Sequence, residues 1–394
     1  MFRVRLLLAA GVLLLSARYA RPESPPVANA PGSLPDAPAS SSGIAVNLDT
    51  VLRLTSERNA DILAARERVN EAQIAFDAAM NSCRLELFRK DTFKKPVAEA
   101  NLWRRRAELR KVENGNLLDA ANTYFDWLTA LRGEVVARDL MKLEEKLLDL
   151  ARKSAKTVKP VQVVVEAIET AVTGRQQYIL QTHQRGEAAA AKLAYLMGMN
   201  GGTLRPTETL EPINRVDTSV PVESLVRQAQ DNGPGVRELQ GLIAAIQQGI
   251  DQARVAQCIC AHLHAALVCA QLQMAESQMQ QARFSLLSLQ LKLRAGVEDA
   301  YTAILSGRDQ IAQAAKAIDH AKETYRFMDE RLPPTESLDE ALKNKTFDGV
   351  LNSIRQLSQA WANYVTAVSN YNKAQARLLI FLGNYTSDCP ANPH

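Results

Sequence analysis

The sequence carries one long amphipathic pattern twice, and the second copy is displaced from the first by about 174 positions. Apolar positions coincide in the two copies; for example, Val51 matches Leu225 and Ile62 matches Val236. A tandem repeat of this length constrains the architecture before any single residue is interpreted, because both copies are expected to fold alike. The matching segments are residues 51–79 with 225–253, 122–131 with 299–308, and 192–198 with 377–383.

The apolar residues of each copy are spaced as in a coiled coil. A run with 4-3-4-3-4 spacing extends from Leu117 to Val135, and a run with 3-4-3-4-3 spacing extends from Ile354 to Tyr371. Aromatic residues make up only 5% of the chain, which suits long helices with narrow seams. We therefore expect a predominantly all-α fold of long antiparallel coiled-coil helices in a tandem repeat, with Asp49 as the N-cap of the first helix.

The N-terminus has the pattern of a secretory signal peptide, which predicts that the chain is exported. Arg3 and Arg5 precede an apolar run at residues 6–15 that is too short to span a bilayer. A segment rich in Pro, Ser and Ala follows, and it lacks the apolar surface needed to fold. The predicted regions are a signal peptide (1–20), a disordered linker (21–46), a first helical repeat (47–199), a connector (200–220), a second helical repeat (221–384) and a C-terminal tail (385–394).

Three segments, taken in order, resemble the TolC-like outer-membrane efflux protein family. They are LDTVLRLTSERNADILAARERVNEAQ from Leu48, ANTYFDWLTAL from Ala121 and YVTAVSNYNKAQARLLIFLG from Tyr364. The resemblance implies a homotrimer whose helices form a periplasmic α-barrel and whose strands form a β-barrel in the outer membrane of a Gram-negative-type bacterium. It also implies a passive conduit that works with a periplasmic adaptor and an inner-membrane pump, in efflux or type I secretion, without catalysis or a cofactor.

The chain departs from the family pattern where the membrane strands belong. A membrane strand needs about 9–11 residues, but the first slot, residues 81–95, is short and allows one short strand at most. The second slot, residues 255–275, has no turn-forming residue and is expected to continue as one helix from Asp251 to Gln290. We therefore expect little or no β-barrel, which puts the contact with the outer membrane in doubt. The alternative function is a periplasmic coiled-coil scaffold without transport activity.

Candidate sites are few, and no enzyme, nucleic-acid or phosphate-binding motif is present in the sequence. Cys258, Cys260, His262 and His264 are spaced so that a helix could place pairs of metal ligands together. The same residues also fit small, fairly apolar filler, which is the favoured interpretation. The remaining candidates are the turns where the helices are expected to reverse, which correspond by position to the periplasmic aperture and adaptor-contact surface of the family: Lys156, Lys159, Pro160, Lys345, Phe347 and Asp348.

Overall fold

The computed structural model describes residues 43–85, 94–155, 161–200, 203–259, 265–332 and 340–384, and all of them belong to one compact unit. Helices dominate this part of the chain, as predicted. The elements in order are β1 (Ile44–Val46), α1 (Leu48–Arg58), α2 (Ala60–Leu85), α3 (Lys94–Ala155), α4 (Val161–Leu196), β2 (Leu204–Pro206), α5 (Val222–Asn232), α6 (Val236–Ile259), α7 (Ala265–Glu330) and α8 (Glu340–Phe381).

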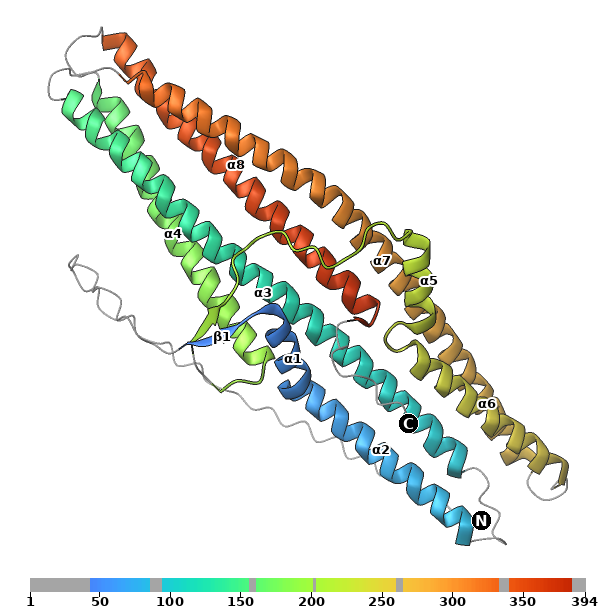
Figure 1. Ribbon diagram of the computed structural model, residues 1–394. Coiled ribbons are helices and arrows are strands. Elements are labelled where there is room, and N and C mark those ends of the chain that lie inside the picture. Colours follow the sequence, from blue (N-terminus) through green and yellow to red (C-terminus); the bar gives the residue numbers. More distant parts are fainter. Residues whose placement is uncertain are drawn as a thin grey trace, which may run out of the picture. The chain divides into compact units, whose positions relative to one another are not determined.

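The helices repeat the same order of lengths, as the duplicated sequence pattern predicts. Helices α1 and α5 each have 11 residues, and α2 and α6 have 26 and 24. The two longest helices, α3 and α7, have 62 and 66 residues, and each is followed by a shorter returning helix. At about 1.5 Å per residue, α3 is roughly 90 Å long. Each half therefore consists of one long rod with shorter helices laid against it (Figure 1).

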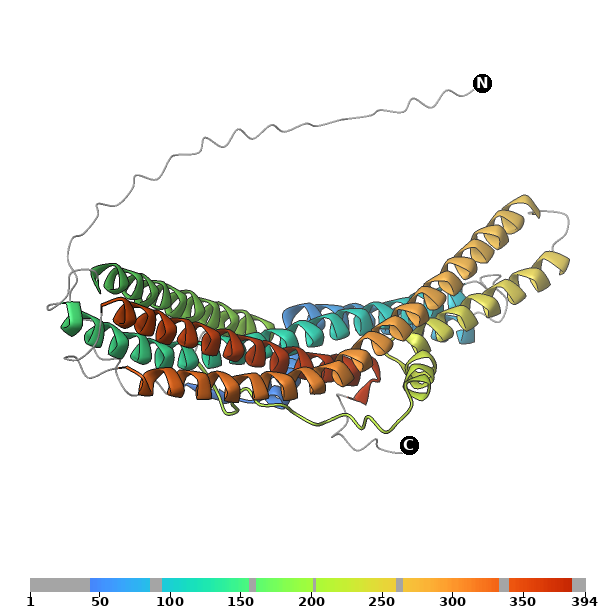
Figure 2. The same ribbon diagram turned by 90° about the horizontal axis from the view of Figure 1, so that it is seen from above.

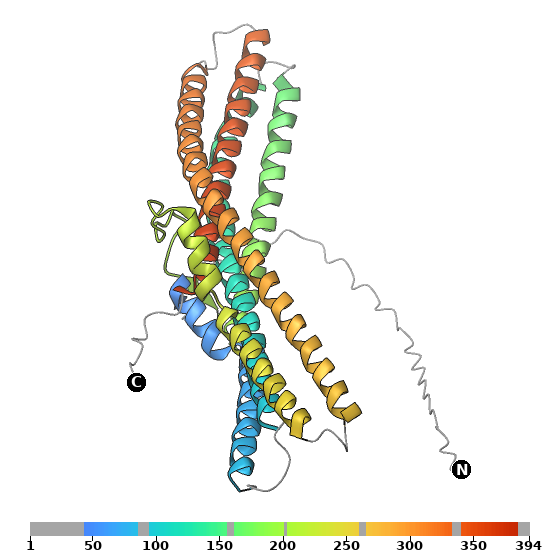
Figure 3. The ribbon, with the colours of Figure 1, turned by 90° about the vertical axis from the view of Figure 1, so that its right-hand side faces the viewer.

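Helix α3 lies in the interior of the helix layer, whereas α7 lies at its edge. Helix α3 contacts α1, α2 and α4 of its own half and also α6 and α8 of the other half. Helix α7 packs mainly against α5, α6 and α8 of its own half, and it meets α3 of the other half through the ion pair between Asp329 and Lys146. Helices α2 and α4 pack against successive lengths of α3, and α6 and α8 do the same along α7 (Figures 1 and 3). One edge of the layer is thus formed by α7 and the other by α4 and α2.

The coiled-coil seams account for most of the core. Tyr124 and Tyr371 are among the largest fully buried side chains, and each comes from a predicted seam. Val135, the last member of the first seam, is 50% exposed, and the buried face of α3 continues through Ala137 and Leu140 instead. The seam spacing therefore identifies the buried face correctly along most of each rod.

Two residues fix the junction between α1, α2 and the end of α4. Asn59 is 1% exposed, and its side-chain amide donates to the carbonyl of Leu196 at 3.0 Å. Its side-chain oxygen accepts the backbone N–H of Asp61 (3.0 Å) and of Ile62 (3.2 Å) at the start of α2. Gly198 ends α4 in the left-handed region, with φ of 65°, and a Cβ there would collide with the carbonyl group of Arg58.

The first helix begins differently from the prediction. Asn47, and not Asp49, is the N-cap of α1, because its side-chain oxygen accepts the backbone N–H of Thr50 at 2.8 Å. Asp49 lies in the first turn and forms an ion pair with Arg215 of the connector (2.5 Å). Both positions suit an acceptor at a helix N-terminus, so the sequence alone favoured the wrong one.

Three segments correct the sequence-based predictions. Residues 44–46, assigned to a disordered linker, form β1 and pair in parallel with β2 of the connector. Residues 81–85, considered for a strand, are the last residues of α2. Helix α6 ends at Ile259 and α7 begins at Ala265, and the two helices pack against each other as a hairpin rather than joining into one helix (Figure 2). Ile250 and Met279 belong to the apolar cluster between them.

Within the described ranges, no helix is both long enough and apolar enough to cross a membrane.

Candidate functional site

Two regions of the helix layer are candidates for function, and they lie at opposite ends of the long rods. The end of α3, the start of α4, the end of α7 and the start of α8 meet at one end, which we call the tip bundle (Figure 1). At the other end lie the hairpins α2–α3 and α6–α7 (Figure 2), and residues of both hairpins line a groove. The tip bundle is held together by one apolar cluster whose members include Leu147, Ile168, Phe347, Val350 and Ile354.

The structure places the first predicted turn where it was expected, but not the second. Helix α3 ends at Ala155 and α4 begins at Val161, so Lys156, Lys159 and Pro160 fall between them, outside the described residues. Helix α7 ends at Glu330 and α8 begins at Glu340, so the second reversal comes before residue 345.

The three candidate residues of the second turn therefore lie inside α8. Lys345 and Asp348 are exposed on this helix near its start. Phe347 is only 4% exposed and packs in the core of the tip bundle. Lys345 and Asp348 can contribute to a surface for a partner, whereas Phe347 supports that surface from beneath.

Ion pairs connect the helices of the tip bundle. The Lys146 ammonium group on α3 donates to both carboxylate oxygens of Asp329 on α7, at 3.0 and 3.3 Å. This hydrogen bond raises the pKa of Lys146 above its ordinary value. Arg152 on α3 pairs with Glu169 on α4 at 2.7 Å. All of these pairs are partly exposed, so each contributes little to stability.

A buried ion pair lies deeper in the same bundle. Arg175 on α4 donates from Nη2 to Oε1 of Glu144 on α3 at 2.9 Å, and from Nε to Oε2 at 3.3 Å. Its remaining Nη1 donates to the hydroxyl of Ser358 on α8 at 2.8 Å. The side chains of Glu144 and Arg175 are only 2% and 13% exposed. This group joins three helices through oriented hydrogen bonds, which apolar packing alone does not provide.

Sequence reasoning missed this ion pair, although a signal was present. Glu144 lies between Leu140 and Leu147 at 4-3 spacing, so it occupies a seam position that would ordinarily be apolar. A carboxylate in a coiled-coil seam requires a buried partner. This rule predicts that a facing helix carries a cation, but it does not identify Arg175 as that cation.

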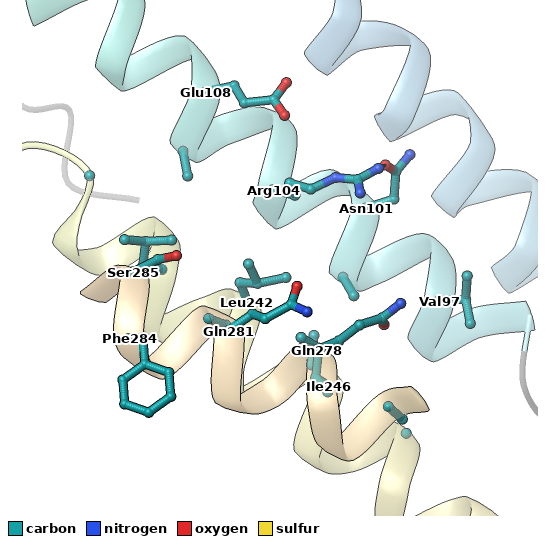
Figure 4. A pocket seen from close by; sticks show the side chains of 18 of the residues that line it. Val97, Asn101, Arg104, Glu108, Leu242, Ile246, Gln278, Gln281, Phe284 and Ser285 are labelled. Carbon is teal, nitrogen blue, oxygen red and sulfur yellow. Dashed lines mark hydrogen bonds between the residues drawn. The ribbon is translucent and has the colours of Figure 1, made fainter. Parts of the chain in front are cut away.

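The groove at the opposite end has a volume of about 1700 Å³. Helix α6 forms its floor with apolar side chains such as Leu242 and Ile246, while α3 and α7 form its two walls (Figure 4). The walls carry polar side chains at coiled-coil spacing. They include Asn101, Arg104, Glu108 and Lys111 on α3, and Gln278, Gln281, Ser285, Ser288 and Lys292 on α7.

Trp103 of α3 has a packing role, and the predicted metal site is not tested by the described residues. Trp103 packs tightly against Gly241 of α6 and lies under the guanidinium group of Arg106, 5.0 Å from the ring centroid. The side chains of Cys258, Cys260, His262 and His264 lie outside the described residues, so the metal hypothesis stays a prediction. Among the described side chains, no group of three or more His, Cys, Asp or Glu residues is arranged to hold a metal ion.

Comparison with known proteins shows what this arrangement resembles. No family model and no curated protein matches the sequence. Solved structures match over most of the chain, among them CusC, described in terms of folding and transmembrane channel formation, with a TM-score of 0.69 and 15% identity over 85% of this chain and 91% of that chain. The chain has the TolC-like fold.

Two further TolC-family structures agree with this result. The outer membrane protein VceC of Vibrio cholerae matches with a TM-score of 0.65 and 13% identity, over 85% of this chain and 96% of that chain. The outer membrane channel CmeC of Campylobacter jejuni matches with a TM-score of 0.64 and 12% identity, over 92% of this chain and 94% of that chain. The resemblance seen in the sequence is therefore confirmed at the level of the fold. At such low identity, the TolC-like fold does not by itself establish function.

Proposed function

We propose that this protein is a homotrimeric, TolC-like channel component in an export pathway of a bacterial envelope. In this role it works as a passive conduit with a periplasmic adaptor and an inner-membrane pump, in efflux or type I secretion, and it catalyses no reaction. Support comes from the fold, which it shares with proteins described as outer-membrane channels. The exported location is part of this proposal and is supported by the same comparison and by the signal peptide predicted from the sequence.

The observation that carries the proposal is the exposure of large apolar side chains on both edges of the helix layer. On α7, Phe284, Leu291 and Leu305 are 67%, 55% and 43% exposed, and their positions differ by multiples of seven. On α4, Leu180 and Tyr195 are 69% and 65% exposed. Exposed apolar stripes on a soluble surface mark interaction sites. Because the two edges belong to different helices, joining α7 of one copy to α4 of the next gives a head-to-tail contact that can close into a ring.

We propose that the tip bundle faces the adaptor and the aperture. The surface in this proposal comprises Lys156, Lys159 and Pro160 at the first turn, with Lys345 and Asp348 on α8. Phe347 contributes by packing under that surface. The apolar cluster and the Glu144–Arg175 pair hold the four helix ends in place.

Light scattering and conductance test the proposal. The purified full chain is expected to be a trimer by size-exclusion chromatography with light scattering, and to conduct ions in a planar bilayer. The double variant Leu291→Asp with Leu305→Asp should dissociate the trimer while keeping its helical circular dichroism spectrum. The matched control is Val135→Asp, on interior helix α3, where an apolar side chain is also half exposed. A compact monomer that never conducts would overturn the proposal.

One observation favours a second candidate, a periplasmic coiled-coil scaffold without transport activity. The connection from α2 to α3 has eight residues, and that from α6 to α7 has five. A strand that crosses a membrane needs about 9–11 residues, so neither connection has room for two such strands. Membrane fractionation separates the candidates, because the scaffold would be recovered in the periplasm as a trimer that needs no detergent and never conducts.

A further inference from the structure

We propose that the groove over α6 binds one acidic phospholipid, with its acyl chains on the floor and its phosphate between Lys111 and Lys292. The inference does not depend on whether the protein conducts, because it concerns a site within a single copy of the chain.

The groove has the size and shape for an extended ligand. Its lining runs from Lys94 to Asn114 along α3 and from Gln271 to Leu293 along α7. At about 1.5 Å per residue, this corresponds to roughly 30 Å of each helix. Its volume of about 1700 Å³ exceeds the roughly 300–1,000 Å³ of an ordinary small-molecule site. A lipid with two acyl chains matches this space better than a compact metabolite.

The floor of the groove is apolar along the length of α6. Leu239, Leu242, Ile246 and Ala253 line it, and Gly249 lets α6 approach Pro96 of α3 closely. Acyl chains that lie on this floor would be removed from water, and each buried methylene group contributes about 0.8 kcal/mol to the binding free energy.

The charged side chains of the walls are mostly cationic. Arg104, Lys111 and Lys292 line the groove, and among the residues that the structure describes none of the three forms an ion pair. Arg104 instead donates to Asn101 at 2.7 Å. The acidic member of the lining, Glu108, is already held by Arg105 at 2.7 Å. The groove therefore offers cations to an anionic headgroup and repels a cationic one.

Two of the lining cations, Lys111 and Lys292, lie toward one end of the groove, whereas Arg104 lies near its middle and Lys94 at its hairpin end. Gly235 lies at the first of these ends, at the start of α6, and a Cβ on it would touch Leu289 of α7 and Arg110 of α3. Lys111 follows Arg110 and Lys292 is one turn beyond Leu289, so the two lysines lie near this level on opposite walls. Arg104, labelled in Figure 4, lies two turns further along α3. Toward the hairpin ends the walls contain small or apolar residues such as Val97, Ala100 and Ala275. The end with Lys111 and Lys292 therefore offers two cations to one phosphate, and the small and apolar wall residues leave room for acyl chains.

Calorimetric titration with short-chain lipids below their micellar concentration tests the proposal. The probes are dioctanoylphosphatidylglycerol, dioctanoylphosphatidylcholine and glycerol 3-phosphate, each added to the purified full chain. We expect the acidic lipid to bind at one site per chain, at least tenfold more tightly than the zwitterionic lipid. Glycerol 3-phosphate should bind far more weakly, because it has no acyl chain to cover the floor.

Two variants locate the site. Lys111→Glu with Lys292→Glu should lower the affinity for the acidic lipid at least tenfold and the affinity for the zwitterionic lipid by a smaller factor. The matched control is Lys142→Glu with Lys316→Glu, which makes the same charge change on α3 and α7 outside the groove. Ser285→Trp, an exposed change that fills the groove, should abolish binding of both lipids, whereas Ser306→Trp on the same helix should not.

Three results would overturn the proposal: equal affinity for the two lipids, unchanged binding in the charge-reversed variant, or tight binding of glycerol 3-phosphate alone. Loss of trimerisation in Ser285→Trp, together with no lipid binding by the unmodified protein, would instead show that the groove is an interface between copies.

Discussion

Replacing Gly198 by alanine tests whether the junction between α1 and α4 depends on a residue without a Cβ. Gly198 has a φ of 65°, its N–H donates to Tyr195 (3.0 Å), and the N–H of Met199 donates to Ala194 (2.9 Å). This is a Schellman motif, in which the left-handed residue ends the helix. Alanine there adds the cost of a left-handed side chain, about 1–2 kcal/mol. It also adds a collision with the carbonyl group of Arg58, for which a typical overpacking cost is about 1–3 kcal/mol.

The repeat provides a matched control at Gly383, the equivalent residue after α8. Gly383 has a φ of 74°, but no atom of the described residues lies within 4 Å of the position that a Cβ would occupy. Gly383→Ala should therefore lower the free energy of unfolding by only about 1–2 kcal/mol, and Gly198→Ala by about 2–5 kcal/mol. Urea denaturation followed at 222 nm, at one protein concentration because assembly also stabilises the fold, measures both values. Equal losses in the two variants would refute the claim that contact with Arg58 matters.

Three further changes have defined outcomes. Asn59→Ala should lower the free energy of unfolding by about 2–3 kcal/mol in urea denaturation, because it removes a helix cap and leaves the carbonyl of Leu196 without its donor; a loss below 0.5 kcal/mol would contradict this. Glu144→Gln should cost about 3–5 kcal/mol by leaving the charge of Arg175 buried without a carboxylate, and Arg175→Met in the same chain should recover much of the loss; a double variant no more stable than the single one would show that the charge is not the cause. Burial and the nearby Glu208 carboxylate raise the pKa of Tyr124 above its ordinary value of 10.0, so the unfolded chain loses this proton first as pH rises. Above pH 10 the free energy of unfolding should fall by up to about 1.4 kcal/mol per pH unit through this group, and Tyr124→Phe should flatten that part of a pH series of urea denaturation curves.

The sequence predicted the helical repeat because that information is periodic and redundant. The seams from Leu117 and from Ile354 each contain several apolar residues, so one exception, such as the exposed Val135, does not change the assignment. Long helices with a buried face are the elements that periodicity identifies best.

The turns were predicted less well because turn preferences are local and weak. Asp348 and Gly349 have the composition of a turn, yet Phe347, Val350 and Ile354 continue a buried helical face through them. Residues 255–275 have no turn-forming residue, yet the chain reverses within this range. The apolar cluster shared by α6 and α7 outweighs the missing signal.

The candidate site could not be predicted from the sequence, because its contacts join residues that lie far apart in the chain. The Glu144–Arg175 pair joins residues 31 positions apart, and Ser358 is 183 positions from Arg175. The pairing of β1 with β2 connects strands of three residues that are separated by most of the first half. The groove depends on the spacing of three helices. Such contacts follow from tertiary packing and cannot be predicted from the local pattern of apolar and polar residues.

The different positions of α3 and α7 in the layer have a consequence for stoichiometry. Inside one molecule, the long rod of the first half lies against the returning helix α8 of the second. Suppose that the free edge of α7 meets α4 of a neighbouring molecule. This joint between molecules then resembles the α3–α8 joint within one molecule, because each places a long helix of one half against the returning helix of the other half. A closed trimer would then have six nearly equivalent joints, three within chains and three between them. The turn angle between the halves, near 60° in that case, would decide how many molecules complete the circle, so mutations at the α3–α8 joint could change the subunit number without touching any contact between subunits.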